Sequence, residues 1–141
     1  MKRKASALWN GNLKDGKGTI SSDSGVLADT QYSFATRFAD GKGTNPEELI
    51  AAAHAGCFSM ALSNELGNAG LTPESIKTTA TVTLEKAAAG FAITAVHLDV
   101  AAKVPGASKQ AFDTAASAAK SGCPVSKVLK ADITMDAKLE N

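Results

Sequence analysis

Alternating apolar and polar side chains predict β-strands in several short stretches of the chain. These are residues 6–9, 18–22, 32–38, 81–85, 95–100 and 133–139. The first two stretches predict a hairpin, and the fourth and fifth flank a turn at residues 87–90 and predict a long hairpin with one polar face. The predicted strands therefore form an early group and a late group.

A long helix is predicted between the two groups of strands, from Pro46 to a stop near Gly67 or Gly70. Asn45 can cap its first turn, and proline suits the first position of a helix. From residue 49 to residue 62 apolar side chains occupy both faces of this helix. We therefore expect the helix to be buried all round.

A second, alanine-rich helix is predicted over residues 108–120, with Ser108 as its cap. Gly122 and Pro124 interrupt the helical pattern, so a new helix is expected to start at or just after Cys123. Free N–H groups and the helix dipole at such an end favour a thiolate.

Strands segregated around a buried helix indicate the α+β class. We expect a single domain over residues 1–141, which is long enough to bury a core. A net charge of +1 gives no field that would attract nucleic acid or an anionic membrane. The basic first residues are not followed by an apolar run, and no stretch reaches membrane-spanning length, so we predict a cytoplasmic protein.

Cys57 and Cys123 are the only two cysteines, and they are the main candidates for chemistry. In the cytoplasm both are expected to be reduced at rest, and a disulfide between them is expected only as a transient state. The apolar helix should shield Cys57 from bulk water, whereas Cys123 is expected at an exposed helix end. By the helix-end argument alone, Cys123 would be the more acidic thiol.

The two histidines leave alternatives open. His54 precedes Cys57 by three residues, so on a helix it can either activate that thiol or simply pack in the core. His97 is expected at the surface. A zinc site made from both histidines and both cysteines would lack the paired Cys-x2-4-Cys spacing typical of such sites, and no metal is predicted.

Four segments of the sequence match a known family. They are Thr36-Arg-Phe, the block from Gly43 through Asn-Pro-Glu-Glu-Leu and His-Ala-Gly-Cys-Phe to Leu62, Gly90-Phe-Ala-Ile-Thr, and Gly122-Cys-Pro-Val-Ser-Lys-Val-Leu. Together they resemble the OsmC branch of the OsmC/Ohr superfamily of thiol peroxidases. The arginine in Thr-Arg-Phe favours this branch over the organic hydroperoxide resistance branch.

The resemblance implies antiparallel sheets around a long central helix in an intertwined homodimer, with active sites near the dimer interface. It implies reduction of hydroperoxides, organic ones preferred, in stress defence and without heme, metal or another cofactor. Cys57 would be the peroxidatic thiol and Cys123 the resolving thiol, and Arg37 and Glu47 would be polar partners of the Cys57 thiolate. The reductant would be a dithiol such as protein-bound lipoamide.

The residues are compatible with this cycle. A thiolate attacks one peroxide oxygen and becomes a sulfenic acid, which a second thiol converts to a disulfide before it over-oxidises. Because a disulfide needs Cα atoms within about 7 Å, the fold must bring Cys57 and Cys123 together. We assign the attack to Cys57, since a water-poor pocket suits an organic peroxide.

Ionisation alone does not explain an arginine at such a site. Lowering the pKa of an ordinary thiol to about 6 raises its thiolate fraction about 13-fold at pH 7.4. The lost nucleophilicity costs about tenfold, so the gain nearly cancels. Arg37, which by itself would be classed as a surface residue, is therefore expected to hold the peroxide and stabilise the leaving oxygen.

Glu47 lies ten residues before Cys57, which on one regular helix is about 15 Å. Either the chain before Leu49 folds back, or Glu47 acts by orienting Arg37, within one subunit or across two. Without the resemblance, Glu47 would be classed as a first-turn acid favoured by the helix dipole.

The alternative to an enzyme is a thiol redox sensor or a module that binds a lipophilic ligand.

Overall fold

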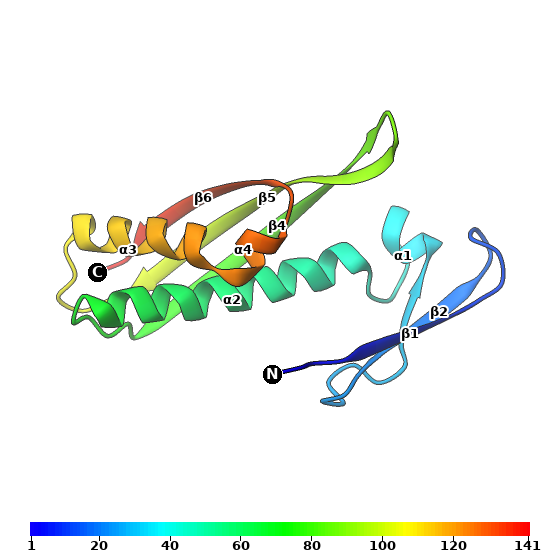
Figure 1. Cartoon of the computed structure of the whole chain (residues 1–141), viewed down its shortest axis with the longest axis horizontal. Helices are drawn as coiled ribbons and strands as arrows, with labels where there is room; N and C mark the ends of the chain where they lie inside the picture. Colours follow the sequence, from blue (N-terminus) through cyan, green and yellow to red (C-terminus); the bar gives the residue numbers. More distant parts are fainter. The chain divides into compact units, whose positions relative to one another are not determined.

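The computed structural model describes residues 1–141, and it contains six strands and four helices (Figure 1). Their order is β1 (Ala5–Asn10), β2 (Lys17–Ser22), β3 (Thr30–Ser33), α1 (Phe34–Phe38), α2 (Pro46–Asn68), β4 (Ser75–Ala87), β5 (Gly90–Lys103), α3 (Lys109–Gly122), α4 (Pro124–Val128) and β6 (Asp132–Leu139). The chain divides into two compact units, Met1–Leu49 and Ile50–Asn141. The mixture of separate sheets and helices confirms the α+β class.

The first unit contains an antiparallel sheet with the strand order β1-β2-β3. The hairpin predicted from the first two apolar stretches is confirmed as β1 and β2. On this sheet the rings of Trp9 and Tyr32 are in tilted contact, with centroids 5.4 Å apart. Gly18 lies against both rings, and a Cβ atom there would come within 2.3 Å of Tyr32, so the aromatic contact requires glycine at this position.

The predicted third strand is wrong in its second half. β3 ends at Ser33, and residues 34–38 form helix α1. Ser33 accepts from the N–H of Thr36, and the hydroxyl of Thr36 accepts from the N–H of Ser33, a reciprocal cap that starts a helix. In a strand, Phe34 and Phe38 would lie on the same side. In helix α1 they lie one turn apart, and their ring centroids are 4.8 Å apart.

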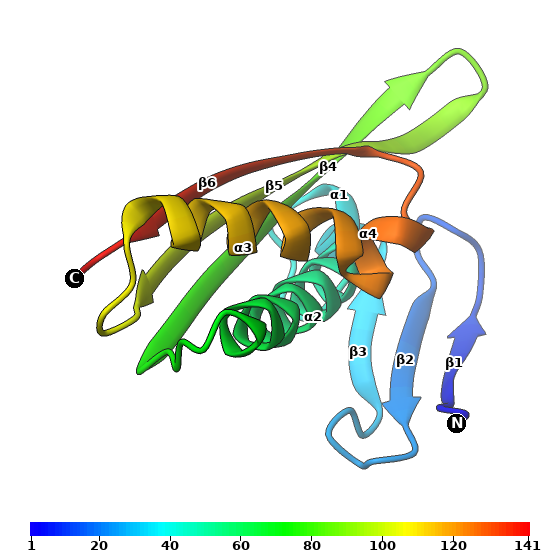
Figure 2. The same ribbon diagram turned by 60° about the vertical axis from the view of Figure 1, so that its left-hand side comes forward.

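The second unit contains the sheet β4-β5-β6, with helices α2 and α3 on one of its faces (Figure 2). β4 and β5 pair antiparallel along almost their whole length, which confirms the predicted long hairpin. β6 confirms the last strand, but it pairs parallel with β5, so the sheet is mixed and not purely antiparallel. The chain returns through α3 and α4 before β6, and this crossover allows the parallel direction.

Helix α2 confirms the predicted long helix, and Asn45 caps it by accepting from the N–H of Glu48 at 2.8 Å. Burial all round is wrong for the single chain. Only one stripe, with a spacing of four residues, is buried, and it consists of His54, Phe58, Leu62 and Leu66. Phe58, Leu62 and Leu66 belong to one core with residues of β5 and α3, whereas Met60 on the same helix is 77% exposed.

The second predicted helix is confirmed as α3, with Ser108 accepting from the N–H of Ala111 at 3.1 Å. The predicted restart is also confirmed, because Cys123 ends α3 and is the N-cap residue of α4, with Pro124 in the first turn. None of the helices is both long and apolar enough to cross a membrane.

Candidate active site

The fold brings Cys57 and Cys123 together within the second unit. Cys57 lies on α2 and Cys123 at the junction of α3 and α4, and their Sγ atoms are 2.8 Å apart across 66 residues of sequence. Both cysteines are free thiols in this structure. Because a disulfide bond is about 2.05 Å long, a small movement would join the two sulfurs.

The two thiols differ in exposure, and the difference is the reverse of the expected one. Cys123 is fully buried, not exposed at a helix end, whereas Cys57 is only half-buried. Cys123 follows directly on α3, whose residues Ala115, Ala116 and Ala119 are buried in the core. A molecule that enters from solvent therefore reaches Cys57 more readily.

The pKa values also differ in direction. Burial, followed by the hydrogen bond with Cys123, raises the pKa of Cys57. Burial also raises the pKa of Cys123, but the Cys57 thiol, the N–H groups of Ser126 and Val125, and the Ser126 hydroxyl together lower it. Cys123 is therefore the more easily ionised of the two thiols. This direction agrees with the helix-end argument.

A cavity of about 400 Å³ opens beside Cys57. Most of its lining is apolar, and it includes Met60, Ala61, Ala119 and Pro124. Its polar lining comes from Asn64 and Glu65 of α2. A space of this size and composition can receive a small apolar molecule next to the half-buried thiol.

His54 is buried in the core, which was one of the two alternatives drawn from the sequence. It also makes a polar contact. Its Nε2 atom is 2.7 Å from the hydroxyl of Ser126 in α4, across 72 residues. Its Nδ1 atom is buried and has no hydrogen-bond partner. Burial lowers the pKa of this imidazole, so the ring is neutral at pH 7.

Arg37 and Glu47 form an ion pair within the first unit. Arg37 donates from Nη2 to Glu47 Oε1 at 2.8 Å and from Nε to both carboxylate oxygens at 3.2 Å. The guanidinium also lies 5.3 Å from the ring centroid of Phe38. Arg37 therefore has a fixed geometry on α1, and its Nη1 atom is left for another acceptor.

The chain before Leu49 does not fold back, so it does not bring Glu47 to Cys57. α2 is already helical at Pro46, so Glu47 and Cys57 lie on one helix and ten residues correspond to about 15 Å of rise. The expectation that Glu47 orients Arg37 matches the ion pair. Whether this pair serves Cys57 stays a prediction.

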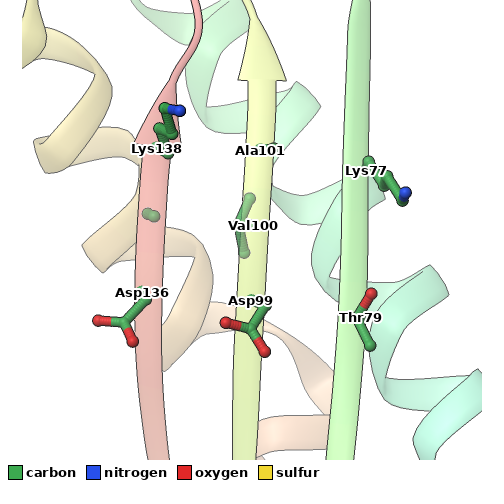
Figure 3. Close-up of a pocket in the computed structure, with 8 residues that line it drawn as sticks. Lys77, Thr79, Asp99, Val100, Ala101, Asp136 and Lys138 are labelled. Carbon is green, nitrogen blue, oxygen red and sulfur yellow. The ribbon is translucent and has the colours of Figure 1, made fainter.

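The four residues considered for zinc do not form one cluster. His97 lies on the sheet face opposite the core, where its Nε2 atom is 3.5 Å from Asp99 and 3.3 Å from Asp136. Asp99 and Asp136 line a cavity of about 420 Å³ together with Lys77, Thr79 and Lys138. Figure 3 shows these side chains on three neighbouring strands. These side chains belong to the outer face of the sheet and include no thiol.

Sequence reasoning missed Ser126 and Val125. The signal was present, because a residue at the N-cap of a helix receives N–H groups from the second and third positions, which here are Val125 and Ser126. The contact between Ser126 and His54 had no such signal, since it depends on how α2 and α4 pack.

Comparisons with known proteins agree with this architecture. Residues 39–138 match the family described as OsmC-like protein. The chain is 58% identical over 139 residues to Peroxiredoxin OsmC of Escherichia coli K12, which covers 99% of this chain and 97% of that protein. Peroxiredoxin OsmC of Shigella flexneri is similar to the same extent.

Two solved structures are also similar. The organic hydroperoxide resistance protein OhrB of Bacillus subtilis has a TM-score of 0.70 at 26% identity, covering 96% of this chain and 98% of that one. An OsmC-like protein of unknown function from Vibrio cholerae has a TM-score of 0.78 at 17% identity, covering 98% and 99%, which supports the fold alone. By its sequence, its fold and its two adjacent thiols, this chain belongs to the OsmC family.

Proposed function

We propose that this thiol peroxidase reduces organic hydroperoxides, and hydrogen peroxide less well, through a cycle between Cys57 and Cys123. The observation that carries the proposal is the 2.8 Å approach of the two sulfurs beside an apolar cavity. Cys57 attacks the peroxide, expels an alcohol or water, and becomes a sulfenic acid. The Cys123 thiolate then forms the S–S bond, and the hydroxyl leaves as water with the proton that Cys123 gave up.

Access to solvent supports Cys57 as the thiol that attacks first, although burial and its neighbours leave Cys123 with the lower pKa. Cys57 is half-buried and lines the cavity, whereas Cys123 is fully buried. A peroxide that cannot touch a sulfur gains nothing from its ionisation. The lower pKa suits Cys123 to resolution, because a resolving thiolate attacks an atom that is already in contact.

In this proposal Arg37 is the group that compensates for the raised pKa of Cys57. Its guanidinium is held at Nε and Nη2 by Glu47, so the remaining Nη1 donor can meet the thiolate or the peroxide. Glu47 acts by orienting Arg37.

We further propose a homodimer and a single functional domain over residues 1–141. The face of α2 away from its buried stripe is uncovered in the single chain, and Met60 on it is 77% exposed. A second copy of this chain would cover such a face, as isologous dimers do. Met60 also lines the cavity beside Cys57, so the partner would complete the wall of the active site.

The reductant in this proposal is a dithiol, for which lipoamide bound to a protein is one candidate. A dithiol can attack the Cys57–Cys123 disulfide and then close on itself, which leaves both protein thiols free. Such a cycle needs a reducing pool, so we place the enzyme in the cytoplasm.

Stopped-flow turnover with cumene hydroperoxide, hydrogen peroxide and a dithiol reductant tests this function. Catalytic consumption should be several-fold faster with cumene hydroperoxide, because the lining of the cavity is mostly apolar. A single oxidation without turnover would instead indicate a thiol sensor. Peroxide consumption that persists in Cys57→Ser would contradict the role of that thiol.

A further inference from the structure

We propose that His54 and Ser126 form a hydrogen-bonded chain that holds Cys123 as a thiolate for the resolving step. Both are positioning residues, since neither touches the peroxide. This inference rests on the proposed resolving role of Cys123. It assigns a function to a buried histidine that the peroxide chemistry itself does not use.

The first link of the chain is the contact between His54 and Ser126. The Nε2 atom of His54 and the Ser126 hydroxyl are 2.7 Å apart, and His54 is fully buried. The second link follows from the helix. Cys123 is the N-cap residue of α4 and Ser126 occupies the third position of that helix, one turn away. The Cys123 thiol makes no side-chain cap hydrogen bond in this structure, but the N–H and the hydroxyl of Ser126 are among the groups that lower its pKa, and we place the second link between that hydroxyl and the ionised sulfur.

The unpaired Nδ1 atom of His54 fixes the direction of the chain. If the Ser126 hydroxyl donated to Nε2, the ring proton would be on Nδ1, and a buried N–H group would have no acceptor, which is rare in proteins. A protonated ring would leave the same orphan. The neutral ring with its proton on Nε2 avoids this cost, because it leaves only a lone pair without a partner.

With that tautomer, His54 donates to the Ser126 oxygen, and the Ser126 hydroxyl proton is free to donate to Cys123. A donor that itself receives a hydrogen bond is polarised and is therefore stronger. The chain stays in place during the cycle. When Cys57 becomes a sulfenic acid, Cys123 loses its contact with the Cys57 thiol, but Ser126 of α4 stays in place.

Few titratable groups act on Cys123. From α2 these are Cys57 and the neutral His54, and Glu65 of α2 lines the cavity next to Cys57. On its own side, Lys120 donates to the backbone carbonyl of Ile133, and Lys127 in α4 is exposed. Ser126 is thus the side chain through which α4 can tune this thiol.

Loss of the Ser126 hydroxyl should change the resolving step in a way that depends on pH. A charge-assisted hydrogen bond corresponds to about a tenfold change in the thiolate fraction below the pKa of the thiol. Each remaining thiolate becomes about threefold more nucleophilic. Ser126→Ala should therefore form the disulfide about threefold more slowly at low pH, and as fast or faster once Cys123 is fully ionised.

The experiment separates the two steps in the full-length protein. Cumene hydroperoxide consumption in a single turnover reports the oxidation of Cys57, and loss of dimedone-reactive sulfenic acid reports disulfide formation, both from pH 6 to 10. Ser126→Ala should leave the first step unchanged and should cross the wild-type profile in the second. Ser126→Thr, which keeps the hydroxyl, should restore the wild-type profile.

Two further variants test the histidine. His54→Leu should shift the second step in the same sense as Ser126→Ala, and the double variant should be no worse than Ser126→Ala alone, because His54 acts through Ser126. His54→Gln keeps an N–H donor at a similar position and should stay close to wild type. It also keeps the test open if the leucine variant folds poorly.

Ser59→Ala is the matched control. Ser59 is half-buried on α2 like Ser126 on α4, and it bonds to Ala55 and Thr78 but not to a cysteine. Its disulfide formation should keep the wild-type pH profile. An unchanged profile in Ser126→Ala, or slowing by the same factor at every pH, would overturn the inference. Wild-type protein that forms no Cys57–Cys123 disulfide would instead contradict the proposed function.

Discussion

Glu47 accepts hydrogen bonds from two nitrogen atoms of the Arg37 guanidinium. Nη2 is 2.8 Å from Oε1, and Nε is 3.2 Å from both carboxylate oxygens. The glutamate side chain is only 13% exposed and that of the arginine is 39% exposed. The less exposed partner therefore fixes the more exposed one. The ion pair fixes the orientation of Nη1. It contributes more to this geometry than to the free energy of unfolding.

Replacing Glu47 tests whether that direction matters for activity. Glu47→Gln removes the charge and one of the two acceptor oxygens, so we expect peroxidase activity to fall about tenfold with little change in the free energy of unfolding. Glu48→Gln is the control, since Glu48 is exposed and is the next residue of the same helical turn. Equal losses in both variants would mean that net charge, not orientation, is responsible.

The cap of α1 offers a second test of how Arg37 is positioned. Ser33→Ala removes the acceptor for the Thr36 N–H and should lower the free energy of unfolding by about 1 kcal/mol, measured in urea. Activity should fall as well, because α1 carries Arg37.

Ser108→Ala provides the comparison for the Ser33 variant. It removes the equivalent cap of α3 and should cost a similar free energy, but Ser108 has no link to Arg37. Activity measured well below the unfolding transition should therefore stay near wild type. If the two variants lost activity to the same degree, stability alone would explain the effect of Ser33→Ala.

The segment from Tyr32 to Phe38 shows where pattern reasoning failed. Apolar side chains at Phe34 and Phe38 satisfy both a strand, where they share one side, and a helix, where they are one turn apart. The reciprocal cap between Ser33 and Thr36 decides in favour of the helix. The parallel direction of β6 had no local signal either, since it depends on the crossover through α3 and α4.

The two thiols could be identified from residue type and setting alone, but their environment could not. Cys123 was expected at an exposed helix end, and it is fully buried instead. The contact between His54 and Ser126 joins residues 72 positions apart, and neither residue type specifies the other. Helix caps and turns could be predicted from the local sequence, whereas contacts that depend on packing between helices could not.

The roles of the two cysteines can be separated by single substitutions. Cys57→Ser should abolish peroxide reduction, because the sulfur that lines the cavity is lost. Cys123→Ser should react once and then accumulate a sulfenic acid that over-oxidises, since no adjacent thiol remains to resolve it. Mass spectrometry after one equivalent of cumene hydroperoxide distinguishes these products. A fast single turnover in Cys57→Ser would reverse the roles.

The uncovered face of α2 predicts an obligate dimer. Sedimentation equilibrium at micromolar protein should give twice the 14.3 kDa mass of the chain. Met60→Glu would place a charge on this face, where Met60 is 77% exposed, and should weaken association. A stable and fully active monomer would contradict both the dimer and a site completed by a second copy.

Arg37→Lys tests whether the arginine does more than ionise Cys57. Burial and the contact with Cys123 raise the pKa of Cys57, so its thiolate fraction, and with it the rate of attack, should rise with pH. Lysine keeps the positive charge but has no planar fork, so it cannot hold Glu47 and an acceptor at once. We expect Arg37→Lys to lose most of its activity at every pH.

The decisive measurement is the second-order rate constant of Cys57 oxidation by cumene hydroperoxide from pH 6 to 10, for wild type and Arg37→Lys. High pH restores the thiolate in both proteins, but it cannot restore a donor aimed at the leaving oxygen. A lower thiol pKa also brings a less nucleophilic sulfur, so ionisation alone can account for only a small factor. The mutant plateau should therefore stay at least tenfold below that of wild type, since one lost transition-state donor can cost about a hundredfold or more. If the two plateaus coincided, Arg37 would act only through the ionisation of Cys57, and its proposed contact with the peroxide would be wrong.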